Sequence, residues 1–241
     1  RGAPALNLNL EAFLAFAGLS WDDVEKVQFP GWKQATEGVI AGQADAVIAS
    51  TTSPPHQRLA ASPRGNLHPT LPHGDTAGWE RARAVMPIWN QRNISKGNGL
   101  ENNMSGEVPY EGGGFPYPIY VTYPDRDEKF IYALTKAVAE HHKEIQEGFA
   151  PASGYAVESQ VLSWVMPYHP GAIRYYKEVG AWTAEHDAHN DKLLKRQDVL
   201  AAAWKTVTDM NLSKDEHVAK WATVRAAALE AAGLSVPFRN F

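Results

Sequence analysis

The sequence predicts an α/β fold that gives way to helices in its carboxyl-terminal half. Up to about residue 124, short apolar runs alternate with helix-like segments and turn residues, the pattern of βα units in a mixed or parallel sheet. From Asp125 onward the pattern is almost entirely helical. Because 44% of the 241 residues are hydrophobic, the chain has enough apolar material to build a core.

Composition narrows the classes of partner. The chain carries 23 basic and 27 acidic residues, so its formal net charge is −4, and we expect no nucleic-acid partner. It contains no cysteine, which excludes disulfides, thiol nucleophiles and thiolate metal sites. No apolar run approaches the roughly 18 residues of a transmembrane helix.

The first elements are a predicted helix and a predicted strand. Apolar residues recur with helical spacing from about Asn9 and stop at Gly18, which suits the position after a helix end. Asn7 or Asn9 could cap the start of this helix. Residues 24–29 alternate with period two, which predicts a half-buried strand ending at Pro30.

A second helix and strand follow. Residues 32–41 predict a short helix that Gly42 ends, and residues 44–49 form an apolar run typical of a buried strand. Proline is tolerated in the first turn of a helix, so Pro54 is expected to begin another short one.

Polar side chains follow the second predicted strand. In open α/β sheets, ligands bind beyond the carboxyl ends of the strands. Ser50, Thr51, Thr52 and Ser53 lie at such an end and would offer donors and acceptors to a small polar ligand, although a helix cap with a solvated turn is the commoner explanation of such a run. Two alternatives also hold for the asparagines before the first helix, which either cap it or border a site where free N–H groups meet a carboxylate. No glycine-rich phosphate motif accompanies them.

The middle of the chain predicts a loop and possible hinge. Residues 88–118 are rich in Asn, Gly and Pro and predict a long irregular loop with at most one short helix. The three glycines at 112–114 suit a hinge or a plain surface loop. Residues 119–123 are β-branched and aromatic and predict a strand.

Helices account for the rest of the sequence. Residues 125–146 predict one helix, in which His141 and His142 point about 100° apart and therefore do not chelate one ion. The tail after Thr183 predicts two further helices, whose apolar stripes pack on the preceding lobe or, alternatively, form a dimer contact.

No reaction centre is recognisable in the sequence. His186 and His189 are three residues apart without the glutamate of a His-Glu-x-x-His motif, and no Gly-x-Ser-x-Gly element is present. We therefore expect a binding protein without a metal or other cofactor, not an enzyme.

Several strings resemble one family. They are Gly2-Ala3-Pro4, Ala17-Gly18-Leu19, the stretch from Ala35 to Ala46, the helix at 130–137 and the string His169-Pro170-Gly171-Ala172-Ile173-Arg174-Tyr175-Tyr176-Lys177-Glu178-Val179-Gly180. Together they resemble the TAXI solute-binding proteins of TRAP transporters, over roughly residues 1–182. The last string is the most specific.

The chain departs from that family in two ways. The family normally has an export signal and the first part of lobe one before the Gly-x-Pro turn, whereas this sequence starts at the turn. One expectation is therefore that the missing amino-terminal segment acts as a separate partner chain. In addition, Ala5-Leu6-Asn7-Leu8-Asn9 replaces the usual Gly-Ser-Gly continuation.

The resemblance implies a bilobal fold of the type II periplasmic-binding-protein kind with a helical carboxyl-terminal extension. Residues 1–118 would form lobe two, 119–182 would return to lobe one, and 183–241 would be the extension. The implied function is a periplasmic receptor that binds a small organic anion, an amino acid or a carboxylate, and docks on the TRAP membrane permease. An enzyme or a signalling domain on the same scaffold is the alternative.

On the family pattern, the ligand cleft is predicted at strand and helix ends that face one crevice. The predicted lining residues are Asn7, Asn9, Trp32, Ser50, Thr51, Thr52, Ser53, Tyr117 and Tyr120. By contrast, His169–Gly180 is predicted to serve packing, with Tyr176 in the core and Arg174 outside the cleft. The alternative is that Arg174 reaches the cleft and clamps a carboxylate.

Overall fold

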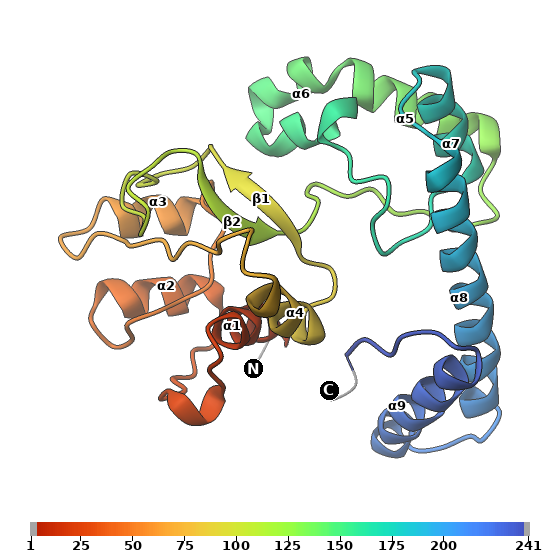
Figure 1. Ribbon diagram of the computed structural model, residues 1–241, viewed down its shortest axis with the longest axis horizontal. Helices are drawn as coiled ribbons and strands as arrows, with labels where there is room; N and C mark the ends of the chain where they lie inside the picture. The colour runs from red at the N-terminus through yellow and green to blue at the C-terminus, as the bar shows by residue number, and fades with distance from the viewer. Residues whose placement is uncertain (1–3, 239–241) are drawn as a thin grey trace. The chain divides into compact units, whose positions relative to one another are not determined.

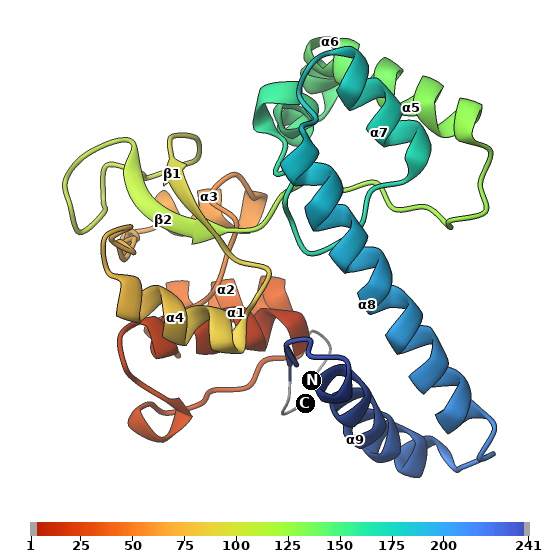
Figure 2. The same ribbon diagram turned by 45° about the vertical axis from the view of Figure 1, so that its right-hand side comes forward.

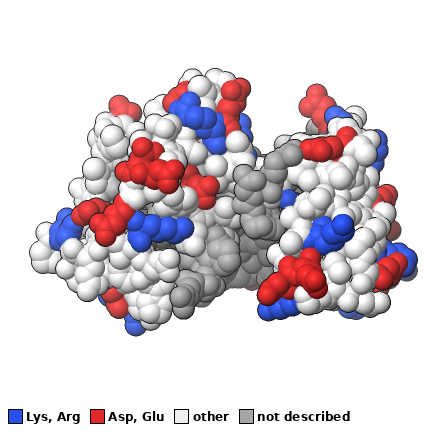
Figure 3. Space-filling model, turned by 90° about the horizontal axis from the view of Figure 1, so that it is seen from below, with Lys and Arg blue, Asp and Glu red and all other residues white. Residues whose placement is uncertain are grey.

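The computed structural model describes residues 4–238 and divides the chain into two compact units. Unit 1 is Arg1–Phe115 and unit 2 is Pro116–Phe241, and each is described by itself. In the described part of both units, no helix has the length and apolar character needed to cross a membrane. On the face drawn in Figure 3, acidic and basic side chains are interspersed, in keeping with the small net charge.

Unit 1 combines helices with one small sheet (Figure 1). Its elements in chain order are α1 (Pro4–Phe16), the 3₁₀ turn η1 (Trp21–Asp23), α2 (Trp32–Ile40), α3 (Pro54–Ala60), α4 (Thr76–Val85), β1 (Asn90–Ile94) and β2 (Tyr110–Gly114). The two strands pair antiparallel, with Asn90 opposite Gly114 and Ile94 opposite Tyr110.

The core of unit 1 lies where α1 and α4 pack side by side and meet the hairpin. Phe16 of α1 packs edge-on against Trp79 of α4, with ring centroids 5.7 Å apart. Trp79 in turn lies over Gly113 of β2, where a Cβ atom would come within 2.9 Å of the indole. The sheet therefore needs a glycine at this position, because a side chain would displace the buried tryptophan.

The predicted helix ends are confirmed in unit 1, because a few neighbouring residues determine them. Gly18 and Gly42 follow α1 and α2 with φ of +77° and +75°, the left-handed conformation that favours glycine. Ser53 caps α3, its Oγ accepting from the backbone N–H of His56. The start of α1 differs from the prediction, since it lies at Pro4 and places Asn7 and Asn9 inside the helix.

The predicted strands at 24–29, 44–49 and 119–123 are wrong, since none of them is in a strand. A strand requires a neighbouring backbone, and within the described residues no backbone-to-backbone hydrogen bond joins the first two segments to any other. Conversely, the irregular loop predicted at 88–118 contains both strands of the hairpin.

Unit 2 is helical. Its elements are α5 (Glu128–Glu140), α6 (His142–Gly148), the 3₁₀ segments η2 (Ala150–Tyr155) and η3 (Val157–Ser159), α7 (Pro170–Glu178), α8 (Ala184–Thr208) and α9 (Lys214–Ala231). The single helix predicted at 125–146 is divided at His141, which ends α5 with φ −102° and ψ 15°. The two tail helices are confirmed and pack as a pair, seen most clearly in Figure 2.

Helices α5 and α7 build the core of unit 2. Tyr175 and Tyr176 of α7 are buried there with Ile131 of α5 and Trp182. At Gly171 a Cβ atom would collide with the carbonyl oxygen of Glu128, so α7 approaches α5 closely at its first turn. The predicted packing role of the 169–180 string is therefore confirmed for Tyr176.

Arg174 lies on the α5 side of the same helix. Its guanidinium lies 4.4 Å from the centroid of the Tyr132 ring, and Tyr132 donates through its hydroxyl to Glu178. These contacts join α7 to α5, so they give Arg174 a place in the helix interface.

Candidate ligand-binding site

A cavity of about 630 Å³ lies in unit 1, within the size range of small-molecule sites. Helices α1 and α2 and the segments at 24–29 and 43–48 wall it. The lining residues are Leu6, Asn7, Leu10, Leu14, Trp21, Val24, Glu25, Lys26, Val27, Gln28, Phe29, Gly31, Trp32, Ala35, Gln43, Ala44, Asp45, Ala46, Val47 and Ile48.

The apolar wall follows from helical spacing. Leu6, Leu10 and Leu14 are four residues apart along α1 and therefore fall on one face, which lines the cavity. Trp21 stands in the turn after α1, where its indole Nε1 donates to Glu11 Oε2 over 3.0 Å. This bond fixes the ring, and Lys26 Nζ lies 4.2 Å from the ring centroid.

Trp32 is held at the start of α2. Its indole Nε1 donates to the carbonyl oxygen of Ile48 over 2.9 Å, so one side chain joins the helix to the segment opposite. Its backbone carbonyl accepts from Thr36 Oγ1 over 3.2 Å. The rotamer freedom of the indole is therefore already lost before any ligand binds, and a ring of this kind offers a fixed apolar face.

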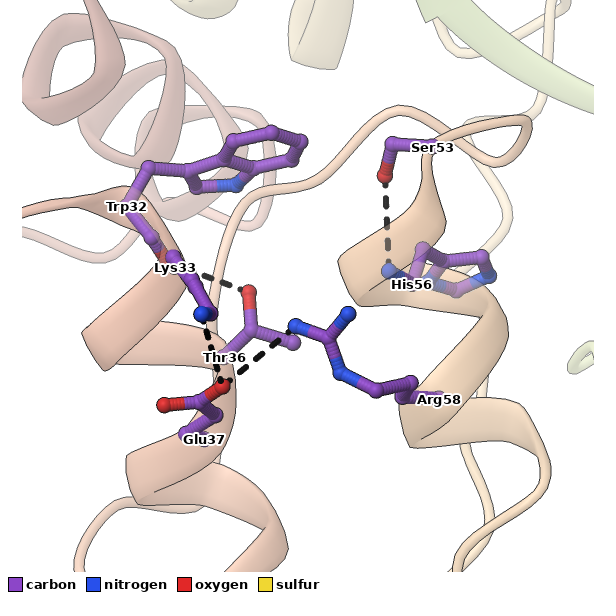
Figure 4. Close-up of polar contacts among 7 residues, drawn as sticks. All are labelled: Trp32, Lys33, Thr36, Glu37, Ser53, His56 and Arg58. Carbon is purple, nitrogen blue, oxygen red and sulfur yellow. Dashed lines mark hydrogen bonds and ion pairs between the residues drawn. The ribbon is translucent and has the colours of Figure 1, made fainter.

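Helix α2 itself is anchored on α3, as Figure 4 shows. Glu37 of α2 pairs with Arg58 of α3 over 3.4 Å and with Lys33 over 3.9 Å. On its buried side, Gly38 packs against the ring of Phe29 so closely that a Cβ atom would clash. The cavity wall that α2 provides is thus supported from behind.

The first turn of α2 has backbone N–H groups that make no hydrogen bond to another backbone group. Gly31 precedes the helix and supplies no side-chain cap. Ala35 N–H bonds to the Gly31 carbonyl, whereas among the described residues the backbone N–H groups of Lys33 and Gln34 make no hydrogen bond to another backbone group. Free N–H groups at a helix start bear partial positive charge and attract anions.

Two of the predicted site residues line the cavity, Asn7 and Trp32. In the described part of the chain, the amide of Asn7 makes no hydrogen bond to protein, so it is available to a ligand. Asn9, two residues on, is only 6% exposed and serves the core instead. Its Oδ1 accepts from the indole of Trp89 over 2.6 Å, and its Nδ2 donates to the Ala5 carbonyl over 2.8 Å.

The four hydroxyl residues at 50–53, called the hydroxyl run, form a turn. Ser53 Oγ donates to the Ser50 carbonyl over 2.8 Å in addition to capping α3, and the hydroxyls of Ser50 and Thr52 lie 3.1 Å apart. Thr51 Oγ1 donates to the carbonyl of Lys96 over 2.8 Å. The alternative of a helix cap with a turn therefore describes these residues, and they do not line the cavity.

Tyr117 and Tyr120 belong to unit 2. They are 62% and 64% exposed, and Tyr120 stacks on Tyr155 with ring centroids 5.2 Å apart. Burial, followed by the hydrogen bond with Tyr120, raises the pKa of Tyr155 above its usual range.

Sequence reasoning missed most of the apolar wall. The signal for Leu6, Leu10 and Leu14 was present as an i, i+4, i+8 stripe, but helix faces of this kind are more often core. Trp21 carried no signal, because its position depends on the turn that follows α1.

A buried histidine pair lies elsewhere in unit 1. His56 of α3 and His68 are 4% and 9% exposed, with ring centroids 5.0 Å apart. His56 Nε2 lies 3.1 Å from the Asn98 carbonyl, and His68 Nε2 lies 2.7 Å from Asn66 Nδ2. No group of three metal-ligating side chains occurs among residues 4–238. The contact of His56 with the Asn98 carbonyl joins α3 to the loop.

An apolar cavity with fixed aromatic rings and a few free polar groups is the arrangement of a small-molecule-binding protein. The sequence matches the NMT1-like family over residues 3–180, well over half of the chain, and the protein belongs to this family. The family is related to periplasmic binding proteins and indicates a function of the substrate-binding type. No curated protein and no solved structure matches the chain.

Proposed function

We propose that the protein is a solute receptor of the TAXI type, which binds a small organic anion in the cavity of unit 1 without transforming it. The observation that carries the proposal is the uncapped start of α2, whose Gly31, Trp32 and Ala35 line the same cavity as Asn7. Membership of the NMT1-like family supports the solute-binding type.

The charge of the ligand follows from the donors. A carboxylate at the start of α2 would accept from the free N–H groups of the first turn, and Asn7, which lines the same cavity, offers its amide as a further donor. The organic part would then lie against the ring of Trp32 and the leucine face of α1. This division between a polar and an apolar end suits an amino acid or another small carboxylate.

The physiological setting rests on the resemblance to TAXI proteins, above all on the string at 169–180. We propose on that basis that the receptor works in the periplasm and delivers its ligand to a TRAP membrane permease. The bilobal type II fold is part of the same proposal. Closure on a ligand would be driven by a higher affinity of the ligand for the closed form.

A ligand screen tests the proposal. Amino acids and small mono- and dicarboxylates are added to the intact chain, and the melting temperature and binding heat are measured. A ligand at concentration [L] should add RT ln(1 + [L]/Kd) to the free energy of unfolding. Hits should be recovered chemically unchanged, because turnover would point to an enzyme.

Two variants locate the site. Asn7→Ala should weaken binding of a hit about tenfold or more, the effect of losing one hydrogen bond to a charged group. Asn93→Ala is the matched control, since Asn93 lies exposed on β1, away from the cavity. Equal affinities for the two variants would contradict the assigned site.

A further inference from the structure

The loop between β1 and β2 contains an asparagine that is followed by a glycine. Among the asparagines of the sequence, Asn98 alone has this neighbour. The structure requires glycine at position 99 for two reasons, because its φ is +63° and because a Cβ atom there would come within 2.3 Å of Asn66 Oδ1. The fold therefore keeps the backbone nitrogen after Asn98 free of a neighbouring side chain.

The backbone nitrogen of Gly99 is held in place through its own residue. Its N–H makes no hydrogen bond to another backbone group among the described residues. The carbonyl of Gly99, by contrast, accepts from the backbone N–H of Asn102 over 3.1 Å and from Asn66 Nδ2 over 3.2 Å. The hydrogen bonding of the loop thus fixes Gly99 without using its N–H.

The side chain of Asn98 is only weakly bound. The residue is half-buried, and its Nδ2 donates to the Thr51 carbonyl over 3.4 Å, which is long for a hydrogen bond. Asn103 in the same loop is bound at both ends of its amide. Its Oδ1 accepts from the backbone N–H of Ser105 and its Nδ2 donates to the Leu100 carbonyl, over 2.8 and 2.7 Å. Of these two asparagines, Asn98 has the amide that is easier to release.

A buried donor contacts the peptide group between Asn98 and Gly99. His56 Nε2 lies 3.1 Å from the Asn98 carbonyl oxygen, and because a carbonyl only accepts, we assign the hydrogen to Nε2. When this peptide group loses its N–H proton, the negative charge spreads onto the carbonyl oxygen. A donor that already points at the oxygen stabilises such a charge, as in an oxyanion hole.

We propose that Asn98 is a modification site, at which the folded chain converts the asparagine to aspartate or isoaspartate with the help of the His56 N–H. Solvent hydroxide removes the proton of the Gly99 nitrogen, and the nitrogen attacks Cγ of Asn98. The new N–Cγ bond closes a succinimide ring while the Cγ–Nδ2 bond breaks, and ammonia leaves with a proton from water. Water then opens the ring, so the conversion needs neither an oxidant nor a reductant.

The products differ in the path of the backbone. Opening of the ring at Cγ gives aspartate, whereas opening at the backbone carbonyl gives isoaspartate, in which the chain runs through an additional methylene group. Both products add a negative charge to the loop. Residues 98 and 99 do not line the cavity of unit 1, so this inference does not depend on the proposed solute.

Mass spectrometry tests the modification. The intact chain is incubated at mildly alkaline pH and then digested. The fragment with residue 98 should gain the mass difference between an amide and an acid, and should separate into two products that match synthetic aspartate and isoaspartate standards. Asn103 should stay unchanged, and Asn98→Gln should give no product at this position. If residue 98 stayed intact after the free peptide Ser-Lys-Gly-Asn-Gly-Leu had reacted, the proposal would be overturned.

A second comparison tests the part played by His56. His56→Phe keeps an aromatic ring but lacks the donor, and should slow the conversion about tenfold, the effect of losing one hydrogen bond to a charged group. His141→Phe, at an exposed histidine of unit 2, is the matched control and should leave the rate unchanged. An unchanged rate in folded His56→Phe would overturn the proposal.

A measurement on the wild-type chain does not depend on how the variant folds. The conversion is followed at the same pH with and without guanidinium at a concentration that unfolds the chain. Unfolding separates His56 from the Asn98 carbonyl, so the folded chain should react faster than the unfolded chain. A rate in the folded chain that equals or falls below the unfolded rate would overturn the proposal.

Discussion

The indole N–H of Trp89 donates to Oδ1 of Asn9 over 2.6 Å, joining residues 80 positions apart in the core of unit 1. Both side chains are buried, and the ring of Trp89 also packs edge-on against Phe13, with centroids 4.8 Å apart. Asn9 thereby fixes α1 against the segment that leads into β1. Asn9, which the sequence predicted to line the ligand cleft, is instead a structural partner of Trp89.

Replacing Asn9 should therefore lower stability and leave ligand binding intact. Asn9→Ala leaves the buried indole N–H without an acceptor, which costs about 1–3 kcal/mol of unfolding free energy. Urea denaturation followed by tryptophan fluorescence measures this loss, with the exposed Asn93→Ala as control. An unchanged unfolding midpoint, or a loss of solute affinity in the folded protein, would contradict this role.

Thr51 should behave as a residue of the turn. Thr51→Ala removes the hydrogen bond to the Lys96 carbonyl, which is exposed, so we expect a loss of only about 0.5–1.5 kcal/mol. Solute affinity should be unchanged within error, because the side chain does not line the cavity. Calorimetric titration with a hit from the carboxylate screen checks this. If Thr51→Ala bound the solute tenfold more weakly, the hydroxyl run would have to be part of the binding site.

Within the string at 169–180, Tyr176 should contribute much more to the stability of the protein than Arg174. Tyr176→Ala empties a core position in unit 2 and should cost about 3–5 kcal/mol, the range for large aromatic truncations. Arg174→Ala removes a cation–π contact with Tyr132, for which about 0.5–1 kcal/mol is expected. Chemical denaturation of both variants, monitored by circular dichroism, compares them. Similar losses of unfolding free energy for the two variants would contradict this difference in their contributions.

The sequence predicted those helix ends that are determined by residues close together in the chain. The ends of α1 and α2 at Gly18 and Gly42 were predictable because the left-handed conformation after a helix favours glycine. So was the helix start at Pro54, because Ser53 and the proline act within one turn.

Features that depend on contacts between residues far apart in the sequence were not predicted. The segment at 24–29 has strand periodicity, but pairing requires another backbone, and the described residues supply none. The hairpin was missed for the opposite reason, since glycines in β2 weaken the strand signal and are required there by Trp79 and Ile94 packing on them. The same limit applies to Asn9, whose partner lies 80 residues away.

Acid should destabilise unit 1 through its buried histidine pair. Burial lowers the pKa of His56, against the weaker opposing effect of the Asn98 carbonyl. Burial also lowers the pKa of His68, and the positive charge that His56 would carry adds to this; the Asn98 and Gly99 carbonyls and Glu101 oppose it. Tyr110 stacks on His68, and Asn66 meets its Nε2, so neither neighbour compensates a charge on the ring.

The direction of the pH effect follows from linkage. Because both folded-state pKa values lie below the unfolded value of 6.5, the unfolded chain binds more protons as the pH falls through this range. The stability that the neutral pair contributes is therefore complete above about pH 6.5 and is lost progressively below it, until the pH passes the folded-state pKa values. Each group contributes a slope of at most about 1.4 kcal/mol per pH unit.

Denaturation of the intact chain between pH 7.5 and 5 measures this slope. His68→Gln should flatten it, because one of the two titrating groups is gone, although the variant also loses stability at neutral pH. Asn93→Ala, which changes an exposed and non-titrating side chain of β1, is the control and should leave the slope as in the wild type. If His68→Gln kept the full wild-type slope, the acid sensitivity would have to arise from groups other than this pair.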